Sequence, residues 1–163
     1  MGSYRTLVEI ARQLGLDRCP PFYKDISFLM ALLAGGLFWF GIWMFSTIHF
    51  LAIKHVWSWG FISLVLWKPL LEELLFRGFL QGILSRQFWA QQALVGITVA
   101  NSITSLLFMV GHFGRHPPKW AIAVIVPSLI YGYFRDRYRS VYPSVALHSF
   151  YNTGYFLLTG VPR

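Results

Sequence analysis

Apolar residues fill long runs of this chain, and short polar segments separate the runs. Five runs are long enough, or nearly so, for a membrane-crossing helix of about 20 residues: residues 26–53, 56–84, 93–113, 120–134 and 141–158. No small-residue cleavage site follows the first run, so we expect a retained span rather than a signal peptide. Pro69 interrupts the second run and predicts a kink at residues 67–69.

Residues 1–25 are the least apolar part of the chain and predict an amphipathic segment ahead of the spans. We expect a short helix there, lying at the membrane surface. Residues 26–163 contain no repeat or low-complexity tract, and we expect them to form a single membrane-embedded domain. The apolar positions of the first segment recur at helical spacing, at Leu7, Ile10, Ala11 and Leu14.

The composition favours a membrane protein. The chain is 56% hydrophobic, 18% aromatic and only 12% charged, which is too apolar for a soluble globular domain. The sequence therefore predicts an all-α fold: a polytopic membrane helix bundle of about five to six spans, in which the kinked second span carries two adjacent acids. Cys19 is the only cysteine, which excludes an intrachain disulfide.

The chain has a net charge of +8. It contains no basic run and no nucleic-acid-binding motif, so we do not expect nucleic acid as a partner. A membrane explains the excess better, because cytoplasmic loops accumulate Lys and Arg. The predicted loops on the N-terminal side carry more of these residues than the loops on the other side. This distribution predicts an N-terminus in the cytoplasm.

Residues 70–80 place two acids and an arginine inside an almost continuous apolar run. Ionisable groups at bilayer depth are costly and usually face a protein interior, where they serve a function. On a helix Glu73 and Arg77 pair at i, i+4, whereas Glu72 points about 100° away. We expect Arg77 to neutralise Glu73 and Glu72 to remain available as a base, unless Lys68 neutralises it. The alternative is a buried ion-pair cluster that only fixes helix packing.

Two later spans each carry a pair of residues at i, i+4: Phe108 with His112, and His148 with Asn152. This spacing puts each pair on one helix face. Together with Glu72 they supply a carboxylate, two imidazoles and an amide, which can activate water and hold an oxyanion. Taken singly, His112 also fits an interfacial histidine, and the other pair fits an interhelical hydrogen bond.

The three motifs, in this order, resemble the signature of the CAAX-protease and bacteriocin-processing (CPBP) family. Its members are glutamic-type intramembrane endopeptidases with several spans, and the resemblance covers about residues 68–155. The motifs read Glu72-Glu73-x-x-x-Arg77, Phe108-x-x-x-His112 and His148-x-x-x-Asn152.

The resemblance implies a role for each motif residue. Glu72 would be the general base, and His112 would position the same water molecule. His148 and Asn152 would form an oxyanion hole, while Arg77 would hold the second acid and order the site. The resemblance implies no metal or other cofactor.

Two other interpretations stay open at this point. The same Glu and His residues could hold a catalytic zinc, although a His-Glu-x-x-His motif is absent and Arg77 argues against an added cation. The chain could also be a non-catalytic scaffold, immunity or sorting protein whose polar groups only fix packing.

The resemblance also implies the partners, namely the lipid bilayer and a protein or peptide substrate at the membrane. The substrate could be a prenylated C-terminus, a bacteriocin precursor or a sorting tag, and the sequence does not choose among them. We expect a prokaryotic inner (cell) membrane as the location.

Overall fold

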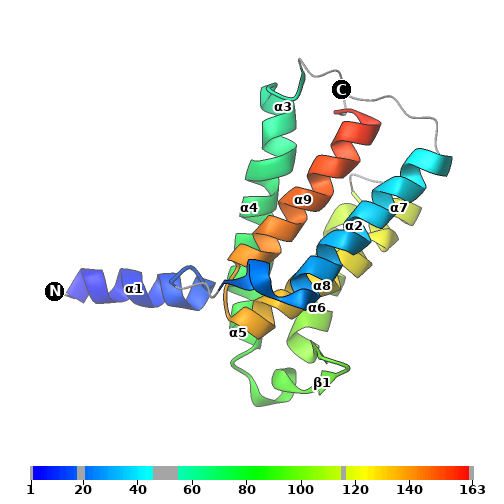
Figure 1. Cartoon of the computed structure of the whole chain (residues 1–163). Helices are drawn as coiled ribbons and strands as arrows, with labels where there is room; N and C mark the ends of the chain where they lie inside the picture. The colour runs from blue at the N-terminus through cyan, green and yellow to red at the C-terminus, as the bar shows by residue number, and fades with distance from the viewer. Residues whose placement is uncertain (1, 18–20, 46–54, 115–116, 162–163) are drawn as a thin grey trace.

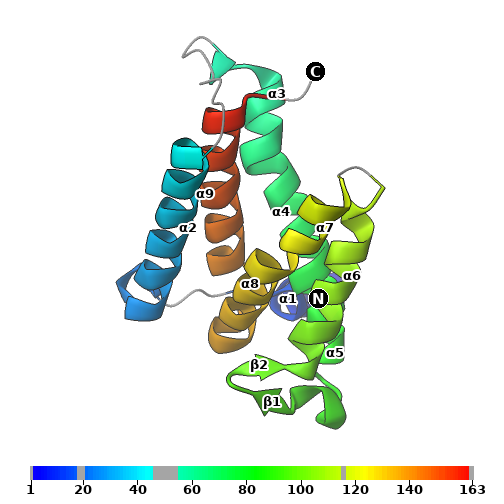
Figure 2. The ribbon, with the colours of Figure 1, turned by 90° about the vertical axis from the view of Figure 1, so that its right-hand side faces the viewer.

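A computed structural model describes residues 2–17, 21–45, 55–114 and 117–161, with side chains from Val8 onward. The elements are α1 (Gly2–Leu14), η1 (Phe22–Lys24), α2 (Ile26–Phe45), α3 (Trp59–Ile62), η3 (Ser63–Trp67), α4 (Lys68–Glu73), η4 (Leu74–Gln81), α5 (Gly82–Leu84), η5 (Phe88–Gln91), β1 (Ala93–Leu94), β2 (Ile97–Thr98), α6 (Val99–His112), α7 (Pro118–Ala123), α8 (Ile125–Tyr138) and α9 (Tyr142–Thr159). Figures 1 and 2 show a bundle whose body is formed by α2, α9 and the helix that runs from α3 to α5. Helices α6 to α8 pack beside them, and α1 projects sideways.

The bundle buries many polar side chains beside an apolar core around Phe28, Phe134 and Leu147, and it exposes many apolar side chains on its outer surface. Such a distribution suits lipid surroundings, where apolar side chains face outward and ionisable groups turn toward the protein. The buried polar residues include Glu73, Arg77, Gln81, Asn101, Thr104, Ser105, Ser128, Ser144 and His148. The exposed apolar residues include Leu29, Leu33, Leu37 and Phe40 of α2, and Leu71, Leu75, Phe79 and Ile83 of the helix with the acids.

Among the described residues, α2 is the one helix that is both long and apolar enough to cross a membrane, with a mean hydropathy of 2.0 over its most apolar window. Residues 46–53 of the predicted first span lie outside the described residues. The prediction of five to six crossings therefore stays a prediction, as does the location of α1 at the membrane surface.

The segments α3 to α5 follow one another without a break, and we call residues 59–84 the acid-bearing helix. Two parts of it, η3 and η4, are π-helical. The carbonyl oxygen of Leu64 receives no backbone hydrogen bond from Lys68 or Pro69. Lys68 donates its N–H to Ser63 O, and Pro69 has no N–H. Asn152 of α9 supplies the donor, with Nδ2 at 3.0 Å from Leu64 O. The helix thus continues through Pro69, and the kink at residues 67–69 stays a prediction.

The prediction of a third span from residue 93 is wrong at its start, because α6 begins at Val99. Strands β1 and β2 precede it and pair as an antiparallel hairpin, the one strand pair within the ranges that the structure describes. The turn residues Val95 and Gly96 have φ angles of 52° and 80°, as a two-residue hairpin turn requires. Thr98 then caps α6 by accepting a hydrogen bond from Asn101 N.

The helices predicted after residue 119 agree more closely with the structure. The predicted helix at residues 120–134 is divided into α7 and α8 at Val124, and α8 continues to Tyr138. Helix α9 agrees with the predicted residues 141–158 to within one residue at each end.

Asp25 fastens the start of α2 to the end of α8. Its Oδ1 accepts the Ser27 backbone N–H at 2.8 Å, and its Oδ2 accepts Arg137 Nε at 2.7 Å and the Tyr138 hydroxyl. The Tyr138 hydroxyl and the Ser27 N–H, which stabilise the carboxylate, hold the pKa of Asp25 at about 2. The carboxylate therefore stays ionised at neutral pH and keeps its three donors.

Arg135 of α8 joins the end of α1 to the acid-bearing helix. Its Nη2 donates to Gln13 O at 3.3 Å and its Nε donates to Arg77 O at 3.0 Å. A glycine of the acid-bearing helix permits α1 to come this close, because a Cβ on Gly82 would stand 3.0 Å from Gln13 O. The N-terminal segment thus touches the helix that carries the acids.

Replacing Gly132 by alanine should destabilise the bundle. A Cβ at Gly132 would lie 1.9 Å from Oδ1 of Asn101, which is fully buried. We expect the free energy of unfolding to fall by about 1–3 kcal/mol, the usual cost of overpacking, measured by thermal unfolding in detergent. Gly111→Ala is the matched control, because nothing lies within 4 Å of a Cβ there. Equal unfolding midpoints for the two variants would contradict the close approach of α6 and α8.

Val95→Asn should stabilise the protein. Val95 is β-branched, 94% exposed and held at a positive φ, and this conformation costs a β-branched residue about 1 kcal/mol or more. Asparagine adopts it readily, so the unfolding midpoint should rise. Leu94→Asn, at an exposed neighbour that does not have a positive φ, should give no such rise.

Candidate active site

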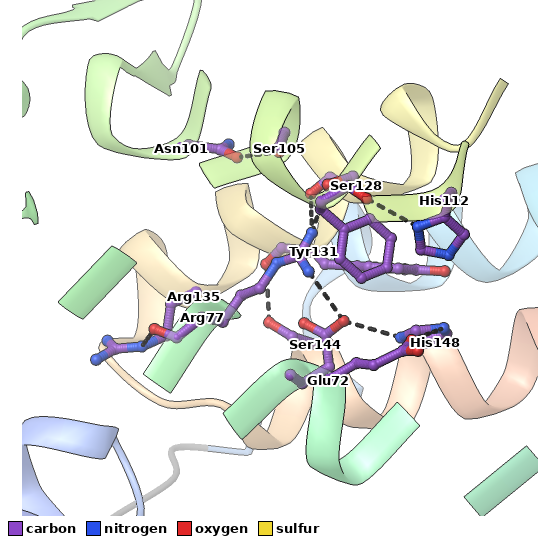
Figure 3. A network of polar contacts seen from close by, with 12 residues as sticks. Glu72, Arg77, Asn101, Ser105, His112, Ser128, Tyr131, Arg135, Ser144 and His148 are labelled. Atoms are coloured by element: carbon purple, nitrogen blue, oxygen red, sulfur yellow. Dashed lines mark hydrogen bonds and ion pairs between the residues drawn. The ribbon is translucent and has the colours of Figure 1, made fainter. Parts of the chain in front are cut away.

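A buried ion pair lies in the middle of the bundle (Figure 3). Arg77 Nη1 lies 3.2 Å from Glu73 Oε1, and both side chains are fully buried. The pairing agrees with the i, i+4 spacing in the sequence. Arg77 Nη2 also donates to the carbonyl oxygen of Ser128 at 2.9 Å and to its hydroxyl at 2.6 Å. Arg77 is thereby fixed between the acid-bearing helix and α8.

His148 of α9 completes this cluster. Its Nδ1 lies 2.8 Å from Glu73 Oε1. Because an ionised carboxylate only accepts hydrogen bonds, Nδ1 carries the proton. The other ring nitrogen, Nε2, lies 3.7 Å from Glu72 Oε2. The imidazole therefore stands between the two adjacent acids, and its Nε2 faces the acid that Arg77 does not hold.

Glu72 differs from Glu73 in its surroundings. Its side chain is 26% exposed, whereas that of Glu73 is fully buried. Within the described ranges, His148 is the one ion-pair partner of Glu72, and no ion pair joins Lys68 to it. The rival pairing with Lys68 is thus not formed in the structure, and the Glu72 carboxylate can reach a substrate or water.

His112 of α6 approaches the cluster through Phe108. Its Nδ1 lies 2.8 Å from Phe108 O, and the two rings are 4.5 Å apart. The Phe108 ring in turn meets the His148 ring edge-on at 6.0 Å. Figure 3 shows both histidines at the same end of the cluster.

Asn152 lies one helical turn beyond His148 on α9, but its Nδ2 is directed at Leu64 O. Of the predicted site residues, the structure thus joins Glu72, Glu73, Arg77 and His148 by direct contacts. It adds His112 through an aromatic ring. It gives Asn152 a backbone partner in η3.

The described residues contain no group of three or more His, Cys, Asp or Glu side chains placed to hold a metal ion. Arg77 already places a positive charge 3.2 Å from Glu73 Oε1. The arrangement places a partly accessible carboxylate, that of Glu72, beside the oriented imidazole of His148.

Sequence reasoning missed the contribution of α8. Ser128 binds Arg77, Tyr131 stacks on His148 and Arg135 holds the Arg77 backbone. These residues and Gly132 occupy positions i, i+3, i+4 and i+7 of one helix, and this spacing could have revealed a single inward face. Gln81 is a further buried partner, which donates to Gly132 O at 2.9 Å.

Residues 54–154 match the family model described as Type II CAAX prenyl endopeptidase Rce1-like. No curated protein and no solved structure matches the chain. The matched region contains every residue of the cluster, and α1 and α2 precede it. The match confirms the CPBP resemblance, and members of this family are integral membrane proteins that act as CAAX-type proteases. Because the match covers more than half of the chain, the protein belongs to the type II CAAX prenyl endopeptidase Rce1-like family.

Proposed function

We propose that the protein is a glutamic-type intramembrane endopeptidase that hydrolyses a peptide bond of a membrane-associated or C-terminally tagged protein. The observation that carries this proposal is the difference between the two adjacent acids. Arg77 binds Glu73 in the interior, while Glu72 stays partly exposed beside His148 Nε2. An available carboxylate next to an oriented imidazole supports activation of water.

In the proposed reaction Glu72 accepts a proton from water as the water oxygen bonds to the scissile carbonyl carbon. The carbonyl oxygen becomes an oxyanion, and His148 Nε2, when protonated, donates to it. The C–N bond then breaks, and Glu72 returns its proton to the leaving amine. Glu73 supports these steps by holding His148 at Nδ1. His112 would position the attacking water.

Asn152 keeps its proposed place in the oxyanion hole through its second N–H. A side-chain amide has two N–H donors, and the contact with Leu64 O uses one of them. The other remains for the oxyanion, one turn from His148.

The substrate and the orientation belong to the same proposal. The family description supports a prenylated C-terminus among the three substrate classes considered. The distribution of Lys and Arg supports a cytoplasmic N-terminus, and we propose a prokaryotic inner membrane as the location. Substrate and lipid are the expected partners.

Glu72→Gln should slow cleavage strongly without unfolding the protein. Glutamine keeps the shape of the side chain but cannot accept a proton, so the rate should fall by about 10²–10⁴-fold. Mass spectrometry of truncated protein termini in cells, wild type against variant, would measure the loss. Glu9→Gln makes the same chemical change at an exposed acid of α1 and should cleave normally. Full cellular function of a folded Glu72→Gln protein would instead favour a scaffold.

Removal of metal ions should leave cleavage unchanged. The proposed steps use side-chain proton transfer alone, so the purified protein should keep its rate after dialysis against a chelator. Loss of activity that returns on addition of Zn²⁺ would show that the zinc interpretation is right.

A further inference from the structure

Tyr131, a buried residue of α8, has a hydroxyl that the proposed mechanism does not use. The residue is 2% exposed, and a buried tyrosine hydroxyl usually has a hydrogen-bond partner. The other two tyrosines of α8 have one: Tyr133 accepts from Arg137 Nη1, and Tyr138 donates to Asp25. The Tyr131 hydroxyl forms no hydrogen bond with any described residue. Its donor is therefore available to a bound molecule.

The Tyr131 ring is held firmly inside the cluster. It lies parallel to the His148 ring, with centroids 5.0 Å apart and planes at 16°. Arg77 Cζ stands 5.4 Å from its centroid, and Ser144 Oγ donates to the Tyr131 carbonyl at 2.8 Å. In Figure 3 the ring extends from α8 toward the end of the cluster where His112 and His148 lie.

The charged groups of the proposed reaction lie next to the Tyr131 ring. Arg77 stands against the ring, and His148, which stacks on it, contacts both Glu72 and Glu73. An oxyanion is best stabilised by two or more aligned donors. Asn152 gives one of its two N–H groups to Leu64 O, so a donor at Tyr131, fixed beside His148, would add to the His148 N–H and the one N–H that Asn152 has left.

We propose that Tyr131 is a further catalytic residue, whose hydroxyl donates a hydrogen bond to the oxyanion formed on the substrate carbonyl beside His148. The inference rests on the proposed endopeptidase function. No proton is transferred: the phenol keeps its proton and stabilises the negative charge until the C–N bond breaks. The parallel stacking on His148 sets the direction of both donors together.

Tyr131→Phe tests this directly, because it removes the hydroxyl and keeps the ring. We expect the rate of formation of Glu72-dependent truncated termini to fall by about 10²–10³-fold, the usual effect of losing one oxyanion donor. With a purified protein and a peptide that contains the cleaved sequence, the loss should appear in kcat rather than in KM. The unfolding midpoint should not change, because no described residue loses a hydrogen bond.

Tyr151→Phe is the matched control. Its ring lies 5.7 Å from that of Tyr131, and its hydroxyl donates to Ala31 O at 2.7 Å. This variant should lower the unfolding midpoint and keep the cleavage rate, which is the reverse of the result for Tyr131→Phe.

Two outcomes would overturn the inference alone: a wild-type kcat for Tyr131→Phe, or a fall of its unfolding midpoint as large as that of Tyr151→Phe. A parallel sample of Glu72→Gln separates these from failure of the function itself. If Glu72→Gln forms the same termini as wild type, the endopeptidase proposal is wrong and the role of Tyr131 falls with it.

Discussion

The structure depends on the fully buried pair of Glu73 and Arg77. Moving each charge out of water costs several kcal/mol, and breaking such a pair by removing one member typically costs about 3–5 kcal/mol. Side chains and backbone from three helices supply the hydrogen bonds of the pair. Glu73 accepts from Arg77 and His148, and Arg77 also donates twice to Ser128. The packing of α8 and α9 on the acid-bearing helix is therefore set by charge and hydrogen bonding as much as by apolar contact.

The same pair explains why the adjacent residues Glu72 and Glu73 have different surroundings. Successive helix positions diverge by about 100°, so the arginine that reaches Glu73 cannot equally serve Glu72. Glu73 uses its charge to hold Arg77 and to fix the imidazole of His148 by its Nδ1. Glu72 points in a different direction from the same helix. Its carboxylate lies beside His148 Nε2 and is partly exposed. Glu73 thus orients the imidazole that lies beside Glu72, the base of the proposed reaction.

The parts of this arrangement that depend on spacing along one helix could be predicted from the sequence. The pairing of Glu73 with Arg77 and the extent of α9 are of this kind. The hairpin before α6 was missed because residues 93–98 read as part of an apolar run, although Gly96 and the cap Thr98 mark a turn and a helix start. The number of crossings and the catalytic roles stay predictions, since neither follows from helix geometry.

Asn152 shows why one residue's contribution cannot be assigned from a motif alone. Pro69 leaves Leu64 O without a backbone donor, and Asn152 provides it from another helix. The partner of a carbonyl left open by a proline depends on which helix packs there, so no local pattern predicts it. Since this contact holds η3 against α9 just ahead of Glu72, replacing Asn152 would remove a packing contact together with the proposed oxyanion donor. Loss of cleavage in such a variant is therefore weaker evidence for an oxyanion donor than loss on removing a hydroxyl with no structural partner.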